Sequence, residues 1–223
     1  MGQALTVFLI LLALALTGLV IALWLRLRQA TQREALQALA ARRGWGLTFV
    51  GQRLGRPSVL RLIPRAGVGW TVTVHGEEND VPMFRAAPQS TDFEADEPKW
   101  DDGLLIIGPA AEPDVTPAEV SGGRLQLTRL IGEELAGYGE ELRAYSAPKG
   151  LTVLASADPG LRADLGDLAR LYADWTKHTS GPEGFPILVL GKEGLRIKLR
   201  HGTRRADRME TFIDFALDAA RIL

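Results

Sequence analysis

Cysteine is absent from this 223-residue chain, which excludes disulfide bonds, thiolate catalysis, iron–sulfur clusters and every zinc site built from cysteine. Neither sign of charge is in excess, since 26 Lys and Arg stand against 27 Asp and Glu. The chain is therefore not a polycation built to coat nucleic acid, and we expect no nucleic-acid partner. With 46% apolar and 24% charged residues the composition is that of a globular protein, which excludes wholesale disorder.

The common catalytic and phosphate-binding motifs are also missing. The chain has no G-x-S-x-G and no H-E-x-x-H motif. Residues 184–192 (GFPILVLGK) space the glycine and the Gly-Lys pair too widely for a phosphate loop, and Glu193 stands where Ser or Thr is needed. Gly44-Trp45-Gly46 lacks the third glycine of a dinucleotide-binding fingerprint. We therefore expect no cofactor, no bound metal and, on balance, no enzyme.

One long apolar run lies at the N-terminus. Ala4 to Leu25 contains no charged side chain. As a helix rising about 1.5 Å per residue it spans roughly 33 Å, which is enough to cross the hydrocarbon core of a bilayer. The alternative is a cleaved signal peptide. No Lys or Arg precedes the run, it exceeds a typical signal-peptide h-region, and no small-x-small site closes it. The sequence therefore predicts a transmembrane anchor over residues 1–25.

Residues typical of a membrane interface follow this run: Trp24, then Arg26, Arg28 and Arg33. Basic residues flank the span only on its C-terminal side, so the positive-inside rule predicts that everything after Leu25 is cytoplasmic. Arginine greatly outnumbers lysine, and Ala, Leu and Gly are abundant, which is typical of GC-rich bacterial genes. We expect a single-pass protein of the bacterial inner membrane whose first partner is the lipid bilayer.

The anchor is expected to continue into a juxtamembrane stalk helix over residues 26–43, because this stretch lacks Gly and Pro and Gly44 follows it. Ala15, Gly18 and Ala22 share one face of the anchor, and small residues allow close helix packing in lipid. This face, extended by Leu36 and Leu39 of the stalk, is a candidate contact with a second copy or with another membrane protein. The competing interpretation is a plain tether, since Gly and Ala are common in such spans.

Residues 44–223 are predicted to form one soluble α+β domain that folds alone, with a mainly antiparallel sheet and about three helices on one face. The hydrophobic patterns and turn residues place strands over 47–50, 58–63, 70–75, 82–87, 104–107, 151–155, 187–190 and 195–199. Helical spacing marks 127–145, a segment after Asp158 as N-cap, and a last helix from about Ala206.

Charge is unevenly distributed along the chain. Arg26 to Arg65 holds nine Arg and one acid, whereas Ala66 to Gly122 holds two basic and twelve acidic residues. The stretch from Ala87 to Gly103 is acidic and contains proline, and it is interpreted as a long solvated loop. A calcium-binding loop is the less favoured alternative, because Glu97 and Gly103 violate the calcium-loop pattern. Trp100, with Asp101 and Asp102 beside it, is the predicted partner-binding group, since an isolated Trp is seldom bare on a polar loop. The alternative is that Trp100 pins this loop to the domain.

Two further interpretations remain open. His75, with the nearby carboxylates of Glu77–Asp80 and with His201, could form a metal-dependent or acid–base site, although residues 75–80 are also typical of a polar turn. The basic run Lys198, Arg200, Arg204, Arg205 and Arg208 is typical of a solvated face, with lipid headgroups as the second meaning. The leading hypothesis is a membrane-tethered cytoplasmic binding or assembly module; an enzyme and a lipid-surface scaffold are the alternatives.

Three segments resemble those of bacterial single-pass membrane-anchored proteins of unknown function. They are the helix end Arg42-Arg43-Gly44-Trp45, the hairpin Gly191-Lys192-Glu193-Gly194-Leu195-Arg196-Ile197 and the helix Phe212-Ile213-Asp214-Phe215-Ala216-Leu217. The shared features are packing and turn residues. The resemblance therefore implies a membrane anchor and a fold, and it implies no activity, cofactor or catalytic residue.

Overall fold

The structure is a computed structural model that describes residues 2–51, 58–67, 69–76, 90–101, 103–109, 142–161, 163–179, 184–199 and 201–223. Up to residue 30, the side chains that it describes are those of residues 6, 12, 16–21, 23, 24, 27 and 30. The expected strand over Pro82–Ala87 lies outside the described residues, as do Glu77–Asp80, Asp102, Arg200 and most of the predicted helix over 127–145. The side chains of Ala15, Ala22, Arg26 and Arg28 lie outside them too.

The described part of the chain has an α+β fold built on one antiparallel sheet of nine strands, which confirms the predicted class. The spatial order of the strands is β1-β2-β3-β4-β9-β8-β5-β7-β6. Their bounds are Trp45–Val50 (β1), Val59–Pro64 (β2), Trp70–His75 (β3), Ser90–Ala95 (β4), Leu105–Pro109 (β5), Arg143–Tyr145 (β6), Leu151–Ala155 (β7), Ile187–Gly191 (β8) and Gly194–Leu199 (β9).

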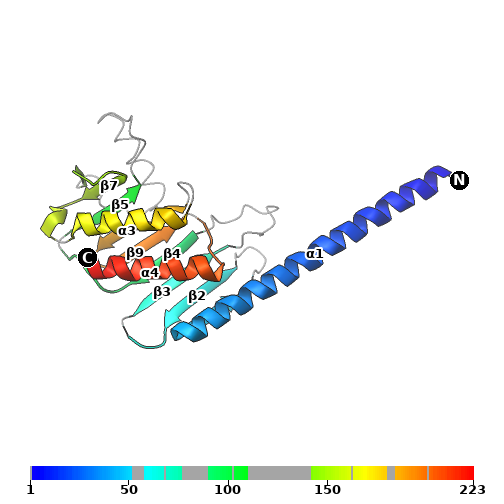
Figure 1. Ribbon diagram of the computed structural model, residues 1–223, viewed down its shortest axis with the longest axis horizontal. Coiled ribbons are helices and arrows are strands. Elements are labelled where there is room, and N and C mark those ends of the chain that lie inside the picture. Colours follow the sequence, from blue (N-terminus) through cyan, green and yellow to red (C-terminus); the bar gives the residue numbers. More distant parts are fainter. Residues whose placement is uncertain are drawn as a thin grey trace.

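The helices α3 (Leu165–His178) and α4 (Ala206–Ile222) lie side by side over one face of the sheet (Figure 1). The long helix α1 (Gly2–Arg43) runs out of the domain as a straight rod (Figure 1). A short 3₁₀ turn, η2, covers Pro159–Leu161. The expectation that the helices share one face is confirmed for the helices that the structure describes.

Strand alternation supplies the core between the sheet and the helices. In β3, Trp70, Val72 and Val74 are buried and the residues between them are partly exposed, as their period of two predicts. In β9, Leu195, Ile197 and Leu199 alternate in the same way. The helices meet this surface with a continuous set of buried side chains: Leu168, Tyr172, Trp175, Met209, Phe212, Ile213, Phe215, Ala216 and Ala219.

The last turns of α1 belong to this core. Leu36 and Leu39 are 1% and 4% exposed, and they pack in the same cluster as Trp45 and the sheet. Arg43 forms ion pairs with Glu210 and Asp214 of α4. Because Leu36 and Leu39 are buried against their own domain, the expectation that they extend a helix-pairing surface below the membrane is wrong.

Further toward its N-terminus, α1 leaves the domain and its described apolar side chains are bare. More than 40% of the surface is exposed at Leu12, Leu16, Leu19, Val20, Ile21, Leu23, Trp24 and Leu27. A Cβ added to Gly18 would have no neighbour within 4 Å. Judged on the described residues, no helix is both long enough and apolar enough to cross a membrane.

Three local predictions are wrong. The acidic stretch forms strand β4 where a loop was expected, and its alternate acids have the strand period: Asp92 and Glu94 point outward while Thr91, Phe93 and Ala95 are buried. The N-cap of α3 is Asp164, whose carboxylate accepts hydrogen bonds from the N–H groups of Gly166 and Asp167.

Asp158 instead closes a short turn by accepting from Gly160 N–H, and the 3₁₀ turn η2 precedes α3. Residues 143–145, at the end of the predicted helix over 127–145, form strand β6 and pair with β7, so that prediction is wrong for the part of it that the structure describes.

Candidate functional site

The direction of α1 defines two opposite edges of the domain. β1 doubles back along α1, since the Arg33 guanidinium lies over the Phe49 ring and that of Arg43 lies over Trp45. The chain just before α4 reaches the same place, because the Arg204 guanidinium lies 5.4 Å from the centroid of Phe49. The start of α4 therefore faces the side from which α1 leaves the domain (Figure 1). We call this side the proximal edge and the opposite side the distal edge.

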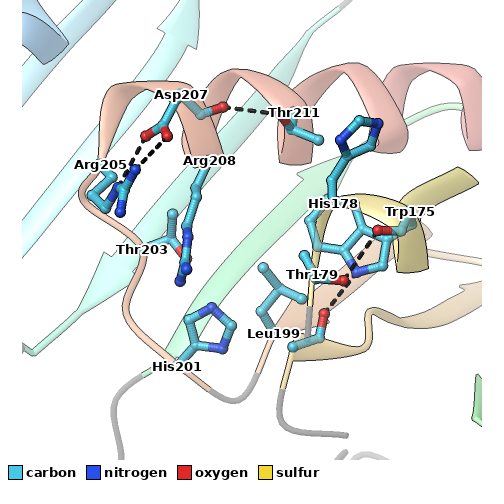
Figure 2. A pocket seen from close by; sticks show the side chains of 11 residues that line it. Trp175, His178, Thr179, Leu199, His201, Thr203, Arg205, Asp207, Arg208 and Thr211 are labelled. Atoms are coloured by element: carbon cyan, nitrogen blue, oxygen red, sulfur yellow. Dashed lines mark hydrogen bonds and ion pairs between the residues drawn. The ribbon is translucent and has the colours of Figure 1, made fainter. Parts of the chain in front are cut away.

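A cavity of about 600 Å³ opens at the proximal edge, between the end of α3 and the start of α4 (Figure 2). Its lining includes His178 from the last turn of α3, His201 and Thr203 from the loop after β9, and Arg205 and Arg208 at the start of α4. The floor is apolar and consists of Trp175 and Leu199. In Figure 2, the Arg208 side chain extends from α4 toward the loop that carries His201 and Thr203.

The loop that carries His201 is held in place by buried hydroxyl groups. Thr91 of β4 is fully buried; its hydroxyl donates to the carbonyl of His201 and accepts from the N–H of Thr203, both at 2.8 Å. Arg204 donates at 2.9 Å to the buried hydroxyl of Ser58 and to the carbonyl of Gly76. The cavity wall is therefore preformed, because each of its anchoring bonds lies inside the domain.

The apolar floor of the cavity is held in place by Trp175. Its indole N–H donates at 2.7 Å to the carbonyl of Gly184, and its ring packs against Phe212 and Phe215. Next to it, the Tyr172 hydroxyl donates at 3.1 Å to the carbonyl of Pro186. Complete burial raises the pKa of the Tyr172 phenol, so this group stays neutral and serves as a structural donor.

Positive charge dominates the cavity lining. Asp207 is its one carboxylate among the described residues, and both oxygens of Asp207 accept from the Arg205 guanidinium, at 3.2 and 2.6 Å. The hydrogen bond from Arg205 is the main cause that lowers the pKa of Asp207. Arg208 forms no side-chain hydrogen bond or ion pair with any described residue. A preformed basic cavity of this kind suits an anionic ligand.

His75 lies on a different surface, the face of the sheet away from α3 and α4. A smaller hollow of about 320 Å³ there is lined by residues of several strands. At its centre Asp92 accepts from the Ser90 hydroxyl at 2.6 Å, and it lies 3.8 Å from His75 Nε2 and 3.7 Å from Lys198 Nζ. His75 and His201 therefore line separate hollows. No group of three His, Asp or Glu side chains within the described residues is placed to hold a metal ion.

Trp100 and Asp101 lie at the distal edge. The backbone N–H of Trp100 donates to the carbonyl of Gly191 at the β8–β9 turn, 3.1 Å away. The half-buried indole ring of Trp100 packs against the core and over Gly103. Asp101 is exposed. The ring thus does pin its loop to the domain, and a partner role for Trp100 and Asp101 stays a prediction.

The interface residues predicted from the sequence are spread along α1. Trp24 is 57% exposed, and Arg33, nine residues further along α1, reaches the domain at Phe49. The sequence did not predict the cavity, since His178 and His201 lie 23 positions apart in the chain. The basic run from Lys198 to Arg208 was the available signal.

No protein-family model, curated protein or solved structure matches this chain.

Proposed function

We propose that this chain is a membrane-tethered module that holds a rigid α+β domain at the cytoplasmic face of a bacterial inner membrane and presents its distal edge to another membrane-associated protein. In this proposal residues 4–25 of α1 cross the bilayer and residues 26–43 connect the span to the domain. The observation that carries the proposal is that one unbroken helix joins the apolar segment to the domain core.

The bare apolar surface of α1 supports the tether. A soluble domain seldom leaves eight large apolar side chains exposed on one projecting helix, because each loses the stabilisation that burial provides. A bilayer would cover this surface. The uncharged run of Ala4–Leu25 and the arginines that follow it fit the length and the cytoplasmic boundary of such a span.

The rigid junction supports a positioning role. Leu36 and Leu39 are buried in the core, and Arg42 and Arg43 are paired with α4, so no flexible linker separates the span from the domain. A domain held in this way presents the same surface to the cytoplasm at all times. The distal edge is that surface, and its two loops (96–101 and 191–194) contain four acids and two lysines.

Orientation is tested by reporter fusions at Leu223. We expect a fluorescent-protein fusion to be bright and an alkaline phosphatase fusion to be inactive, since the domain is cytoplasmic. The reverse pattern would contradict the proposal.

Partner binding is tested with a photo-crosslinking amino acid at position 99 in native membranes, in the otherwise unchanged chain and in each variant. We expect a discrete crosslinked species that Asp101→Lys abolishes. Asp174→Lys, an equal change of charge at an exposed position of α3, should leave the species intact. Equal crosslinking by both variants would show that the distal edge is not the contact.

A further inference from the structure

We propose that the basic cavity at the proximal edge binds the phosphodiester headgroups of anionic phospholipids, so that the domain docks on the bilayer surface. This inference rests on the membrane tether proposed above. It assigns a ligand class to a cavity that partner binding at the distal edge does not use.

The position of Arg33 brings the proximal edge to the membrane. Arg33 lies eight residues after Leu25, about 12 Å along an α-helix. The headgroup layer on each side of the hydrocarbon core is roughly 5–8 Å thick. The Arg33 guanidinium lies 4.1 Å from the centroid of the Phe49 ring, so the domain begins within a few ångströms of the headgroups. Any ligand site at this edge faces lipid.

The chemistry of the cavity matches a phosphodiester. Arg208 and the ring N–H groups of His178 and His201 can donate hydrogen bonds to phosphate oxygens, and an arginine can hold two phosphate oxygens at once. A cavity of about 600 Å³ is large enough for a headgroup and has an apolar floor, Trp175 and Leu199, against which glycerol carbons can lie.

The inference does not depend on the free N–H groups at the start of α4. The carboxylate of Asp207, in the first turn of α4, already accepts from the Arg205 guanidinium. Side-chain cations therefore carry the expected recognition.

Charge also sets the orientation. The distal loops carry four acids and two lysines, whereas the described cavity lining carries two arginines, two histidines and one paired carboxylate. An anionic leaflet attracts the proximal edge and repels the distal edge, which adds to the constraint from α1. Docking would leave Trp100 and Asp101 pointing into the cytoplasm.

The test uses the full chain in lipid nanodiscs, and the absence of cysteine allows one label at a chosen site. A fluorophore is attached at Thr176→Cys, an exposed position beside the cavity on α3, or at Lys192→Cys in the β8–β9 turn of the distal edge. The discs contain either phosphatidylcholine alone or phosphatidylcholine with phosphatidylglycerol, and a small fraction of lipid carries a nitroxide quencher on its headgroup.

We expect strong quenching at position 176 in the anionic discs and several-fold weaker quenching in the neutral discs, with little quenching at position 192 in either. Arg208→Gln should lower the ratio of docked to undocked domains about fivefold, the effect of one basic residue at an anionic surface. Arg170→Gln, an exposed arginine of α3 outside the cavity, should change nothing. Added salt should weaken the quenching, since it screens the attraction.

Two outcomes would overturn the inference while leaving the tether intact. One is equal quenching at position 176 in neutral and anionic discs. The other is competition by millimolar inorganic phosphate, which would identify a site for a free anion. Failure of the chain to co-purify with any disc would instead overturn the tether, so the two proposals fail in distinguishable ways.

Discussion

The guanidinium of Arg33 lies 4.1 Å from the centroid of the Phe49 ring, and this contact joins the projecting part of α1 to the first strand of the sheet. Arg204 lies over the same ring at 5.4 Å. Phe49 therefore links α1 to the loop that forms the cavity wall. A shift of α1 relative to the sheet would therefore displace the Phe49 ring and, with it, Arg204 beside the cavity.

Replacement of this ring should loosen the junction. Phe49→Leu retains an apolar side chain and removes the π face, so we expect a loss of about 1 kcal/mol in unfolding free energy from the two partly exposed cation–π contacts. Thermal unfolding of the full chain in detergent measures this loss. Phe49→Tyr, which retains the π face, is the control and should unfold as the wild type does. Equal losses in both variants would show that the arginines do not use the ring.

The C-terminal turns of α1 should be needed for stability of the isolated domain. A fragment that starts at residue 44 lacks Leu36 and Leu39, and the burial of two leucines stabilises by about 3–6 kcal/mol. We therefore expect fragment 31–223 to fold cooperatively and fragment 44–223 to be far less stable or unfolded. Chemical denaturation of the two fragments measures the difference. Equal denaturation midpoints would mean that the folded domain begins at Gly44, as the sequence predicted.

Gly194 should not tolerate a side chain. Its φ of +105° is a conformation that favours glycine, and a Cβ there would overlap the carbonyl oxygen of Ala95. Gly194→Ala should therefore cost more than the roughly 1–3 kcal/mol of backbone strain alone. Gly150 has a similar φ of +91° with no atom within 4 Å of an added Cβ, so Gly150→Ala isolates the strain. Chemical denaturation measures the two losses in unfolding free energy. Equal losses in Gly194→Ala and Gly150→Ala would contradict the close contact between Gly194 and the Ala95 carbonyl of β4.

The Tyr172 hydroxyl predicts a specific response to alkaline pH. Burial raises the pKa of this phenol, so the folded chain holds the proton to a higher pH than the unfolded chain, whose tyrosine titrates near pH 10. Its contribution to stability is therefore present below about pH 10 and is lost as the pH rises further. Tyr172→Phe should lower the unfolding free energy by about 1 kcal/mol at neutral pH, because the hydrogen bond to the Pro186 carbonyl is lost. Above pH 10 the unfolding free energy of this variant should fall less steeply than that of the wild type. Parallel curves of stability against pH for the two proteins would contradict this.

The sequence predicted the elements that have one clear period. Trp70–His75 alternates strictly and forms β3 with those bounds, and the helix expected from about Ala206 begins at Ala206. The acidic strand β4 was missed because Asp92 and Glu94 face solvent, and a half-exposed strand rich in acids has the composition of a loop. Its burial depends on Thr91 and Phe93, whose partners lie on β3 and β9.

The candidate site was less predictable than the fold. His178 ends a helix and His201 follows a strand, and each has an ordinary local explanation at its place in the sequence. Only the packing of α3 beside α4 brings them to one cavity with Arg208. The packing of Leu36 and Leu39 was also hidden, since an apolar stripe on a helix does not reveal which surface covers it.

Alkaline extraction tests the central claim, that α1 tethers the domain to the membrane, most directly. Membranes from bacterial cells that express the full chain are washed at pH 11 with carbonate and then floated on a density gradient, beside membranes from cells that express residues 31–223. The full chain is expected to stay in the floating lipid fraction, because a spanning helix resists alkaline removal, and fragment 31–223 is expected in the supernatant. Release of the full chain into the supernatant together with the fragment would contradict the tether.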